Sequence, residues 1–374
     1  MYYYLTLTTK CNLLCSYCYG SSNEDFMTEE DLKNYDIDIP TELSYNINKL
    51  KELSKNDDNF SLTFYGGEPL LRIDLIKKII DEVPAKKFML QTNGIFLNKL
   101  EKKYINKFDT ILVSIDGGRE VTDKNRGKGV FDKIINNLNL IRKKGFKGEV
   151  IARMVATEGS NIYKNVTDLI KEGFTSIHWQ LDAQFWSSDY KKRDFKNWSL
   201  KYNKDVEKLI NYWFEDMKSK RRVLKIYPFI GLVHDLYHNI KSPMRCGAGH
   251  SLFGIQTDGK IVGCPITAGY KPLYVGDLNN IKLDKNNKVV LKNLELKEPC
   301  PSCEVLDICG GRCLYANYTK LWGEKGFNEV CGTIKFLINS LKKVLPEIKN
   351  LIKEGIIKEK DLEFNRYNGC EIIP

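Results

Sequence analysis

From residue 2 to about residue 181, short apolar runs alternate with amphipathic stretches. The runs are rich in β-branched and aromatic residues and predict strands at Tyr2–Thr8, Phe60–Tyr65, Lys87–Thr92, Thr110–Ile115, Gly148–Val155 and Ser176–Leu181. Apolar residues at helical spacing between them predict helices near 42–55, 72–82, 96–107, 130–144 and 160–172. This alternation predicts an α/β fold, with parallel strands and outer helices in an open sheet or a partial barrel.

The remainder of the chain has a different pattern. A charged, aromatic helical segment covers about 187–222, and a cysteine-rich tail begins near Pro243. In the tail, Asp258-Gly259 predicts a hairpin turn between Leu252–Thr257 and Lys260–Val262. Two further helices are predicted at roughly 331–344 and 346–357. We predict three segments: 1–222, 223–345 and 346–374.

Composition narrows the class of protein. Apolar residues make up 42% of the chain and charged residues 28%, which is typical of a globular protein. Neither an export signal nor an apolar run of about 18 residues is found, so we expect a cytoplasmic protein with no membrane span. The 11 cysteines are clustered, which favours metal ligands over disulfides in a reducing compartment.

Three of these cysteines share one loop after the first strand. Cys11, Cys15 and Cys18 have the spacing C-x3-C-x2-C. Three thiolates bind three irons of a four-iron cluster and leave the fourth iron open. A zinc loop or an electron-transfer loop is the alternative, although zinc needs a fourth ligand. After the second strand, Gly66-Gly67-Glu68-Pro69 combines two small residues with a carboxylate able to bind an ammonium group.

Together these motifs resemble the radical S-adenosylmethionine (SAM) superfamily, whose signature is C-x3-C-x-aromatic-C followed by GGEP. Tyr17 supplies the aromatic residue. The resemblance implies that SAM chelates the open iron and is cleaved to a 5′-deoxyadenosyl radical, which abstracts a hydrogen atom from the substrate. It also implies that Gly66, Gly67 and Glu68 hold the SAM amino group.

The same resemblance suggests further cofactor-binding residues beyond the predicted strands. Ser114 corresponds to a polar residue on the SAM ribose, Arg153 to a SAM contact, and Asn93 follows the third strand. An ordinary turn or solvated role is the alternative for each of them. Asp116 fits a loop cap equally well, and Asp182 is a plausible carboxylate at the rim.

The tail contains a second ordered set of cysteines, which resembles the SPASM extension of radical SAM enzymes. Its pattern is C…G-x4-C…C-x2-C-x5-C-x3-C…C, and zinc is the alternative ligand. The resemblance implies one complete auxiliary cluster and a second, inner cluster with three ligands. The complete set is Cys300, Cys303, Cys309 and Cys331, and the inner set is Cys246, Cys264 and Cys313.

The fourth position of the inner cluster is left undecided by the sequence. Cys370 is a candidate ligand, a candidate hydrogen-atom donor or an inert thiol, and His250 is a second candidate ligand. The position also fits an open iron that binds substrate. In total we expect SAM and three [4Fe–4S] clusters.

Taken together, the resemblances imply a partial (β/α)6 radical SAM barrel with a C-terminal SPASM domain. The implied activity is oxidative modification of a ribosomally made peptide or a protein, such as a thioether or carbon–carbon crosslink. The alternatives are a sulfatase-type maturase that forms formylglycine, an RNA-modifying enzyme and a non-enzymatic iron–sulfur carrier. The net charge is +10, but lysines are interleaved with acidic residues and clusters remove charge, which argues against nucleic acid.

Partners follow from the same chemistry. We expect an electron donor such as ferredoxin or flavodoxin. The first strand begins at residue 2, so we expect leader recognition by the rim, by the tail or by a separate partner protein. Aromatic residues of the 187–222 region, or just before it, suggest either a peptide groove or helix packing: Phe185, Trp186, Tyr190, Trp198 and Tyr202.

Overall fold

The computed structural model describes residues 1–18, 33–184, 189–242, 244–278, 296–366, 368 and 373–374. These residues form two compact units that interleave along the chain. The first unit comprises Met1–Ile115, Thr122–Val150 and Gly247–Glu295. The second comprises Asp116–Val121, Ile151–Cys246 and Leu296–Pro374.

A largely parallel sheet forms the centre of the first unit. Its strands lie in the order β10-β9-β8-β1-β2-β3-β4. The pairs β8–β1, β1–β2, β2–β3 and β3–β4 are parallel, whereas β8–β9 and β9–β10 are antiparallel. The bounds are β1 Tyr2–Thr8, β2 Ser61–Gly66, β3 Lys87–Thr92, β4 Phe108–Ser114, β8 Leu252–Ile255, β9 Lys260–Val262 and β10 Tyr274–Asp277.

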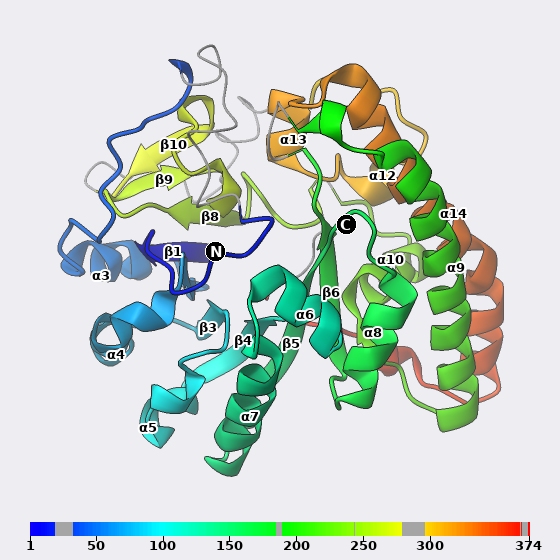
Figure 1. Ribbon diagram of the computed structural model, residues 1–374, viewed down its shortest axis with the longest axis horizontal. Coiled ribbons are helices and arrows are strands. Elements are labelled where there is room, and N and C mark those ends of the chain that lie inside the picture. The colour runs from blue at the N-terminus through cyan, green and yellow to red at the C-terminus, as the bar shows by residue number, and fades with distance from the viewer. Residues whose placement is uncertain (19–32, 185–188, 243, 279–295, 367, 369–372) are drawn as a thin grey trace. The chain divides into compact units, whose positions relative to one another are not determined.

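Amphipathic helices connect the parallel strands of this unit (Figure 1). Ile76, Ile79 and Ile80 form the buried side of α4, and Ile134, Leu138 and Ile141 are buried on α7. Such faces cover a sheet whose own strands are apolar on both sides. The helical elements are α3 Asn48–Lys55, η1 Pro69–Arg72, α4 Ile73–Glu82, η2 Leu97–Lys99, α5 Lys102–Ile105, α7 Val130–Lys143, η4 Pro265–Thr267 and η5 Lys271–Leu273, with α6 Arg119–Arg126 at the boundary of the units.

The second unit combines three parallel strands with long helices. Strands β5 Glu149–Ala156, β6 Ser176–Leu181 and β7 Lys225–Ile226 pair in that order. Helices α9 and α14 pack side by side, and α10 packs against α14 and β6 (Figure 1). The helical elements are α8 Ile162–Lys171, η3 Tyr190–Lys192, α9 Phe195–Lys220, α10 Tyr227–His238, α12 Leu306–Cys309, α13 Leu314–Thr319, α14 Gly323–Lys353 and η6 Glu359–Leu362.

The predicted α/β class is confirmed. The bounds of the six strands predicted between residues 2 and 181 agree with the structure to within two residues. The predicted break between helices 331–344 and 346–357 is wrong, because α14 continues through Pro346. Leu337, Leu341, Ile348 and Leu351 are buried along one side of this helix. Their burial on both sides of the proline outweighs the roughly 3 kcal/mol that a proline costs inside a helix. The predicted helix at 42–55 begins only at Asn48.

The topology of the tail strands differs more from the predicted topology than that of the other strands. The predicted hairpin of β8 and β9 is present, but β8 also pairs in parallel with β1, with Tyr2 opposite Leu252. The tail hairpin therefore extends the sheet that carries the first cysteine loop. None of the helices in the described parts of the chain has the length and apolar content needed to cross a membrane.

Candidate functional site

The first cysteine loop leaves the sheet directly after β1. Cys11 is exposed, whereas Cys15 and Cys18 are half-buried. A tight turn forms where the Cys18 N–H donates to the Cys15 carbonyl at 3.0 Å, and the Leu13 N–H donates to Cys11 Sγ at 3.5 Å. The loop thus carries three thiols on a short, turned piece of chain, which suits them to a shared cluster.

The Gly66-Gly67-Glu68 turn holds the start of this loop in place. The Gly67 N–H donates to the Thr8 carbonyl and the Glu68 N–H to the Lys10 carbonyl, both at 2.9 Å. A Cβ added at Gly66 or Gly67 would lie nearer than 3.0 Å to those same backbone oxygens. The family resemblance implied that the two glycines help to hold the SAM amino group. In the structure they permit close approach of the cysteine loop, and their contact with SAM stays a prediction.

Glu68 connects this turn to the end of β3. Its side chain is fully buried and accepts hydrogen bonds from the Leu70 N–H at 2.9 Å, the Thr92 hydroxyl at 2.8 Å and the Asn93 N–H at 2.7 Å. Burial raises the pKa of Glu68 to about 7, although these three hydrogen bonds lower it. An ionised carboxylate has about four acceptor positions. One therefore remains for a further donor, as the predicted bond to the SAM amino group requires.

We expect the stability of the cluster-free protein to fall as pH rises from about 4.5 to about 7. In this window the unfolded chain has released the Glu68 proton that the folded protein still binds. At 1.36 kcal/mol per pH unit, the loss amounts to about 3 kcal/mol, and it is complete above pH 7. Urea unfolding at about pH 5 and about pH 8 measures the loss. Glu68→Gln, which cannot ionise, should reduce the slope; an unchanged slope in that variant would contradict the assignment.

Asn93 links Glu68 to the first cysteine. Its Nδ2 donates to Asn12 Oδ1 at 2.9 Å and lies 3.8 Å from Cys11 Sγ, while its Oδ1 accepts from the Ile95 N–H at 3.1 Å. Asn93 is buried, so these bonds are shielded from water. A hydrogen-bond donor beside a cluster thiolate raises its reduction potential, because it stabilises the more negative reduced form. The structure thus gives Asn93 a positioning role that the sequence did not suggest.

Replacing Asn93 by alanine should destabilise the protein by about 1–3 kcal/mol, because it leaves the buried Ile95 N–H without its acceptor. We also expect the reduction potential of the reconstituted first cluster to become more negative. Urea unfolding and a redox titration followed by electron paramagnetic resonance measure the two effects. Asn106→Ala is the matched control, because the Asn106 side chain bonds the Lys102 carbonyl at an exposed site. Equal effects of the two variants would argue against this role for Asn93.

A second anchor holds the far end of the loop. The Ser16 N–H donates to the Asn125 carbonyl at 2.9 Å, and the Arg126 guanidinium lies 5.4 Å from the centre of the Tyr17 ring. Asn125 and Arg126 are both buried at the end of α6. Sequence analysis found Tyr17 from its motif but missed Asn125 and Arg126. Their only signal was the short amphipathic pattern of 119–126, which lies within a longer polar stretch.

Arg153 lies in the second unit, where β5 and β6 place it opposite His178. Its Nη1 lies 2.7 Å from His178 Nδ1, and its Nη2 donates to Gln180 Oε1 at 2.8 Å. Since a guanidinium only donates, His178 Nδ1 must accept, so the ring is neutral with its proton on Nε2. Arg153 retains further N–H groups for a ligand, and its predicted SAM contact remains open.

Three other polar residues were singled out in the sequence: Asp116, Asp182 and Ser114. Asp116 Oδ1 accepts from the Val155 N–H at 3.1 Å, which agrees with the loop-cap alternative. Arg193 donates to Asp182 at 2.9 Å, although burial still raises the pKa of this carboxyl. Ser114 is the half-buried last residue of β4, and its predicted ribose contact is untested.

The four cysteines of the predicted outer set all lie in the second unit, and their ligation of one cluster stays a prediction. Burial, with smaller contributions from the nearby Cys331 and Cys303, raises the pKa of Cys300 to about 11. Burial likewise raises the pKa of Cys309 to about 12, again with contributions from Cys331 and Cys300. Asn317 Nδ2 donates to Cys300 Sγ at 3.3 Å. Burial and neighbouring thiols raise the pKa of Cys300, Cys309 and Cys331, which fits a site that a cationic iron cluster would stabilise.

The predicted inner set falls in both units. Cys264 belongs to the first unit, and Cys246 and Cys313 belong to the second. Cys370 lies outside the described residues, and His250 lies in a turn where its N–H donates to the Gly247 carbonyl. Within the described residues, no three histidine, cysteine or acidic side chains converge as a site for a single metal ion. Each thiolate of a [4Fe–4S] cluster binds a separate iron, so cluster ligands surround a larger body.

The suggested aromatic groove is packing where the structure describes it. Trp198 and Tyr202 are buried, and the Tyr202 hydroxyl accepts a hydrogen bond from Trp179 Nε1 at 2.8 Å. Tyr190 stacks on Trp322 and bonds Glu329. Phe185 and Trp186 lie outside the described residues.

Comparison with known proteins tests the predicted superfamily. The model of the radical SAM superfamily matches residues 5–170, a region that contains the cysteine loop, Glu68 and Asn93. Residues 5–170 form a radical SAM domain. This finding confirms the predicted superfamily for residues 5–170, and the chemistry of that family uses SAM and a [4Fe–4S] cluster.

Similarity to individual proteins extends beyond the radical SAM domain. The radical SAM cyclopropyl synthase TigE of Paramaledivibacter caminithermalis is 22% identical over 398 residues, covering 95% of this chain and 76% of TigE. The structure of anSMEcpe with bound AdoMet and Cp18Cys peptide matches with a TM-score of 0.70 and 19% identity, over 94% of this chain and 99% of that one. Streptococcus suis SuiB bound to S-adenosylmethionine matches with a TM-score of 0.54 and 17% identity, over 87% and 75% respectively. These matches confirm that the predicted fold continues through the cysteine-rich tail.

Proposed function

We propose that this radical SAM enzyme oxidatively modifies a side chain or the backbone of a ribosomally made peptide or a protein. The observation that carries the proposal is the similarity to TigE over 95% of the chain, which includes the tail as well as the radical SAM domain. A cyclopropyl synthase forms a carbon–carbon bond, one of the oxidative products expected here. The fold also matches that of anSMEcpe, which binds AdoMet together with a peptide.

The first cysteine loop is the proposed catalytic centre. Cys11, Cys15 and Cys18 would hold three irons of the first cluster, and the donor set of three thiols leaves one iron for SAM. When bound, this cluster and SAM supply the 5′-deoxyadenosyl radical that takes a hydrogen atom from the substrate. The Gly67 and Glu68 backbone bonds hold the loop, and with Asn93 beside Cys11 they would position these groups.

A net oxidation needs an acceptor for a second electron. Removing one hydrogen atom leaves a substrate radical, and a closed-shell product requires the loss of one more electron and one proton. We propose that clusters in the tail accept this electron. The outer one would be held by Cys300, Cys303, Cys309 and Cys331, and the inner one by Cys246, Cys264 and Cys313, with Cys370 as a candidate fourth ligand.

The reaction also requires outside partners. We propose a low-potential donor such as ferredoxin or flavodoxin to deliver the first electron. Recognition of a leader sequence is assigned to the protein itself or to a separate leader-binding partner.

Coexpression tests the proposed function. The enzyme would be produced anaerobically with a short peptide encoded beside its gene, and the peptide analysed by mass spectrometry. We expect a loss of about two mass units for each two-electron oxidation, and no change with a Cys11→Ala enzyme. Peptides left unmodified while a sulfatase fragment gains formylglycine would instead support the sulfatase-type maturase. Failure of the fully reconstituted protein to form 5′-deoxyadenosine would support an electron carrier.

A further inference from the structure

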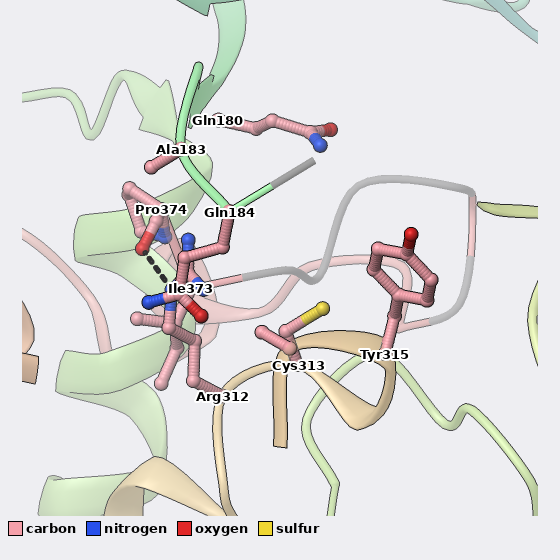
Figure 2. Close-up of a pocket in the computed structure, with 9 residues that line it drawn as sticks. Gln180, Ala183, Gln184, Arg312, Cys313, Tyr315, Ile373 and Pro374 are labelled. Atoms are coloured by element: carbon pink, nitrogen blue, oxygen red, sulfur yellow. Dashed lines mark hydrogen bonds between the residues drawn. The ribbon is translucent and has the colours of Figure 1, made fainter. Parts of the chain in front are cut away.

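A small cavity in the second unit lies at the end of β6, beside Cys313 (Figure 2). Its volume is about 30 Å³, and the residues around it include Gln180, Gln184, Arg312, Cys313, Tyr315 and Pro374. This is the space open to the centres of water-sized molecules, so it exceeds what a single water needs. The cavity is partly open to solvent, so a small polar group of a larger ligand can enter it.

Gln184 is the unusual member of this lining. Only 1% of it is exposed, and neither its amide nitrogen nor its amide oxygen has a hydrogen-bond partner among the described residues. Its backbone is also left-handed, with φ at 65°, a conformation that residues other than glycine rarely adopt. Both features cost stability. Their coincidence at the end of a parallel strand, where ligand sites gather, points to a binding role.

The chemistry of Gln184 defines the group that it can bind. A carboxamide offers one acceptor oxygen and an NH2 donor in a single plane, so its best complement is another amide. Gln184 is neutral and so requires no charge on its ligand, and the cationic Arg312 of the same lining already has a partner in Pro374. The Arg312 Nε donates to the main-chain oxygen of Pro374, the last residue of the sequence, at 3.0 Å (Figure 2).

Gln180 supports the same assignment from the neighbouring side of the cavity. Its Oε1 accepts a hydrogen bond from Arg153, so its amide orientation is fixed. Gln184 is therefore the amide in this lining that lacks a partner at both its oxygen and its nitrogen.

We propose that Gln184 binds one main-chain peptide group of the substrate in this cavity, next to Cys313. The proposal rests on the proposed function only in naming a peptide as the ligand. It assigns Gln184 to substrate binding rather than to the chemistry. The contact would place a stretch of substrate beside a cysteine that is predicted to ligate the inner cluster.

The test uses the small number of glutamines in this chain. Only four are present, Gln91, Gln180, Gln184 and Gln256, so ¹⁵N-glutamine labelling of the reconstituted holoenzyme gives four side-chain amide signals. The probe is N-methylacetamide, a single peptide group. We expect titration with it to shift the Gln184 signal, identified by its loss in Gln184→Leu, and to leave Gln256 unchanged. Gln256 is the internal control, because its amide oxygen already accepts from the Gly269 N–H.

Gln184→Leu should weaken binding of N-methylacetamide at least about tenfold, the effect of losing one or two hydrogen bonds. An unshifted Gln184 signal in the wild-type holoenzyme would overturn the proposal without any variant, so misfolding of Gln184→Leu cannot obscure the result. Equal affinity of the two proteins would overturn it as well. A shifted signal in an enzyme that modifies no peptide would uphold the amide site and reject the proposed function. A modified peptide together with an unshifted Gln184 signal would uphold the proposed function and reject the amide site.

Discussion

An enzyme with Cys15 replaced by alanine should form no 5′-deoxyadenosine above background. Cys15 lies in the middle of the three-thiol loop, and its backbone carbonyl closes the turn to Cys18. Two remaining thiols cannot retain a four-iron cluster, so the reconstituted variant should contain about four iron atoms fewer per chain. Iron analysis together with chromatography of anaerobic reactions containing SAM and dithionite measures both quantities.

The remaining iron separates this outcome from simple unfolding. If the tail cysteines hold two further clusters, the Cys15→Ala protein keeps about eight iron atoms per chain. Leu14→Ala is the matched control, because Leu14 lies in the same loop with 87% of its side chain exposed and should have normal activity. Full activity of Cys15→Ala would remove this loop from the mechanism.

Adding a single methyl group at Gly67 should have almost as large an effect on activity. The new Cβ would lie nearer than 3.0 Å to the backbone oxygens of Thr9 and Lys10, and backbone atoms cannot rotate away as a flexible side chain does. The turn and the cysteine loop must therefore separate, breaking the Glu68 N–H bond to the Lys10 carbonyl. We expect a loss of about 1–3 kcal/mol in the free energy of unfolding from overpacking. Formation of 5′-deoxyadenosine should fall strongly, although every cysteine is intact.

Gly159→Ala provides the comparison for this variant. A Cβ at Gly159 meets nothing within 4 Å, although its φ of 87° makes the backbone unfavourable for alanine. It should therefore lose about 1–2 kcal/mol of stability and keep its cluster and its activity. Thermal unfolding, iron content and SAM cleavage measured side by side distinguish the two. If Gly67→Ala retained normal SAM cleavage, the contact between the glycine turn and the cysteine loop would not control the site.

Much of the site was predictable because it depends on local sequence. The spacing of Cys11, Cys15 and Cys18 confines three thiols to one short loop whatever lies around it. The strands after which the loop, the glycine turn and Asn93 follow were predicted from continuous apolar runs, which reflect burial on both faces of a parallel sheet. The carboxyl ends of parallel strands lie at one edge, so these residues were expected to be neighbours.

The reason for the two glycines was not predictable in this way. Gly66 and Gly67 face the backbone of Thr8 and Lys10, which lies far away in the sequence and meets them only through the pairing of β1 with β2. The same limit applies to Asn125, whose carbonyl holds the Ser16 N–H. Contacts of this kind depend on the path of the chain rather than on residue spacing.

The sequence by itself determined the α/β class, most strand bounds, the three-thiol loop and the superfamily, because periodicity and short spacings act within a few residues. Only the tertiary structure decided that β8 joins β1, that α14 continues through Pro346, and that the buried amide of Gln184 has no hydrogen-bond partner among the described residues. The physical reason is that burial, packing and the satisfaction of polar groups depend on which distant segments come together.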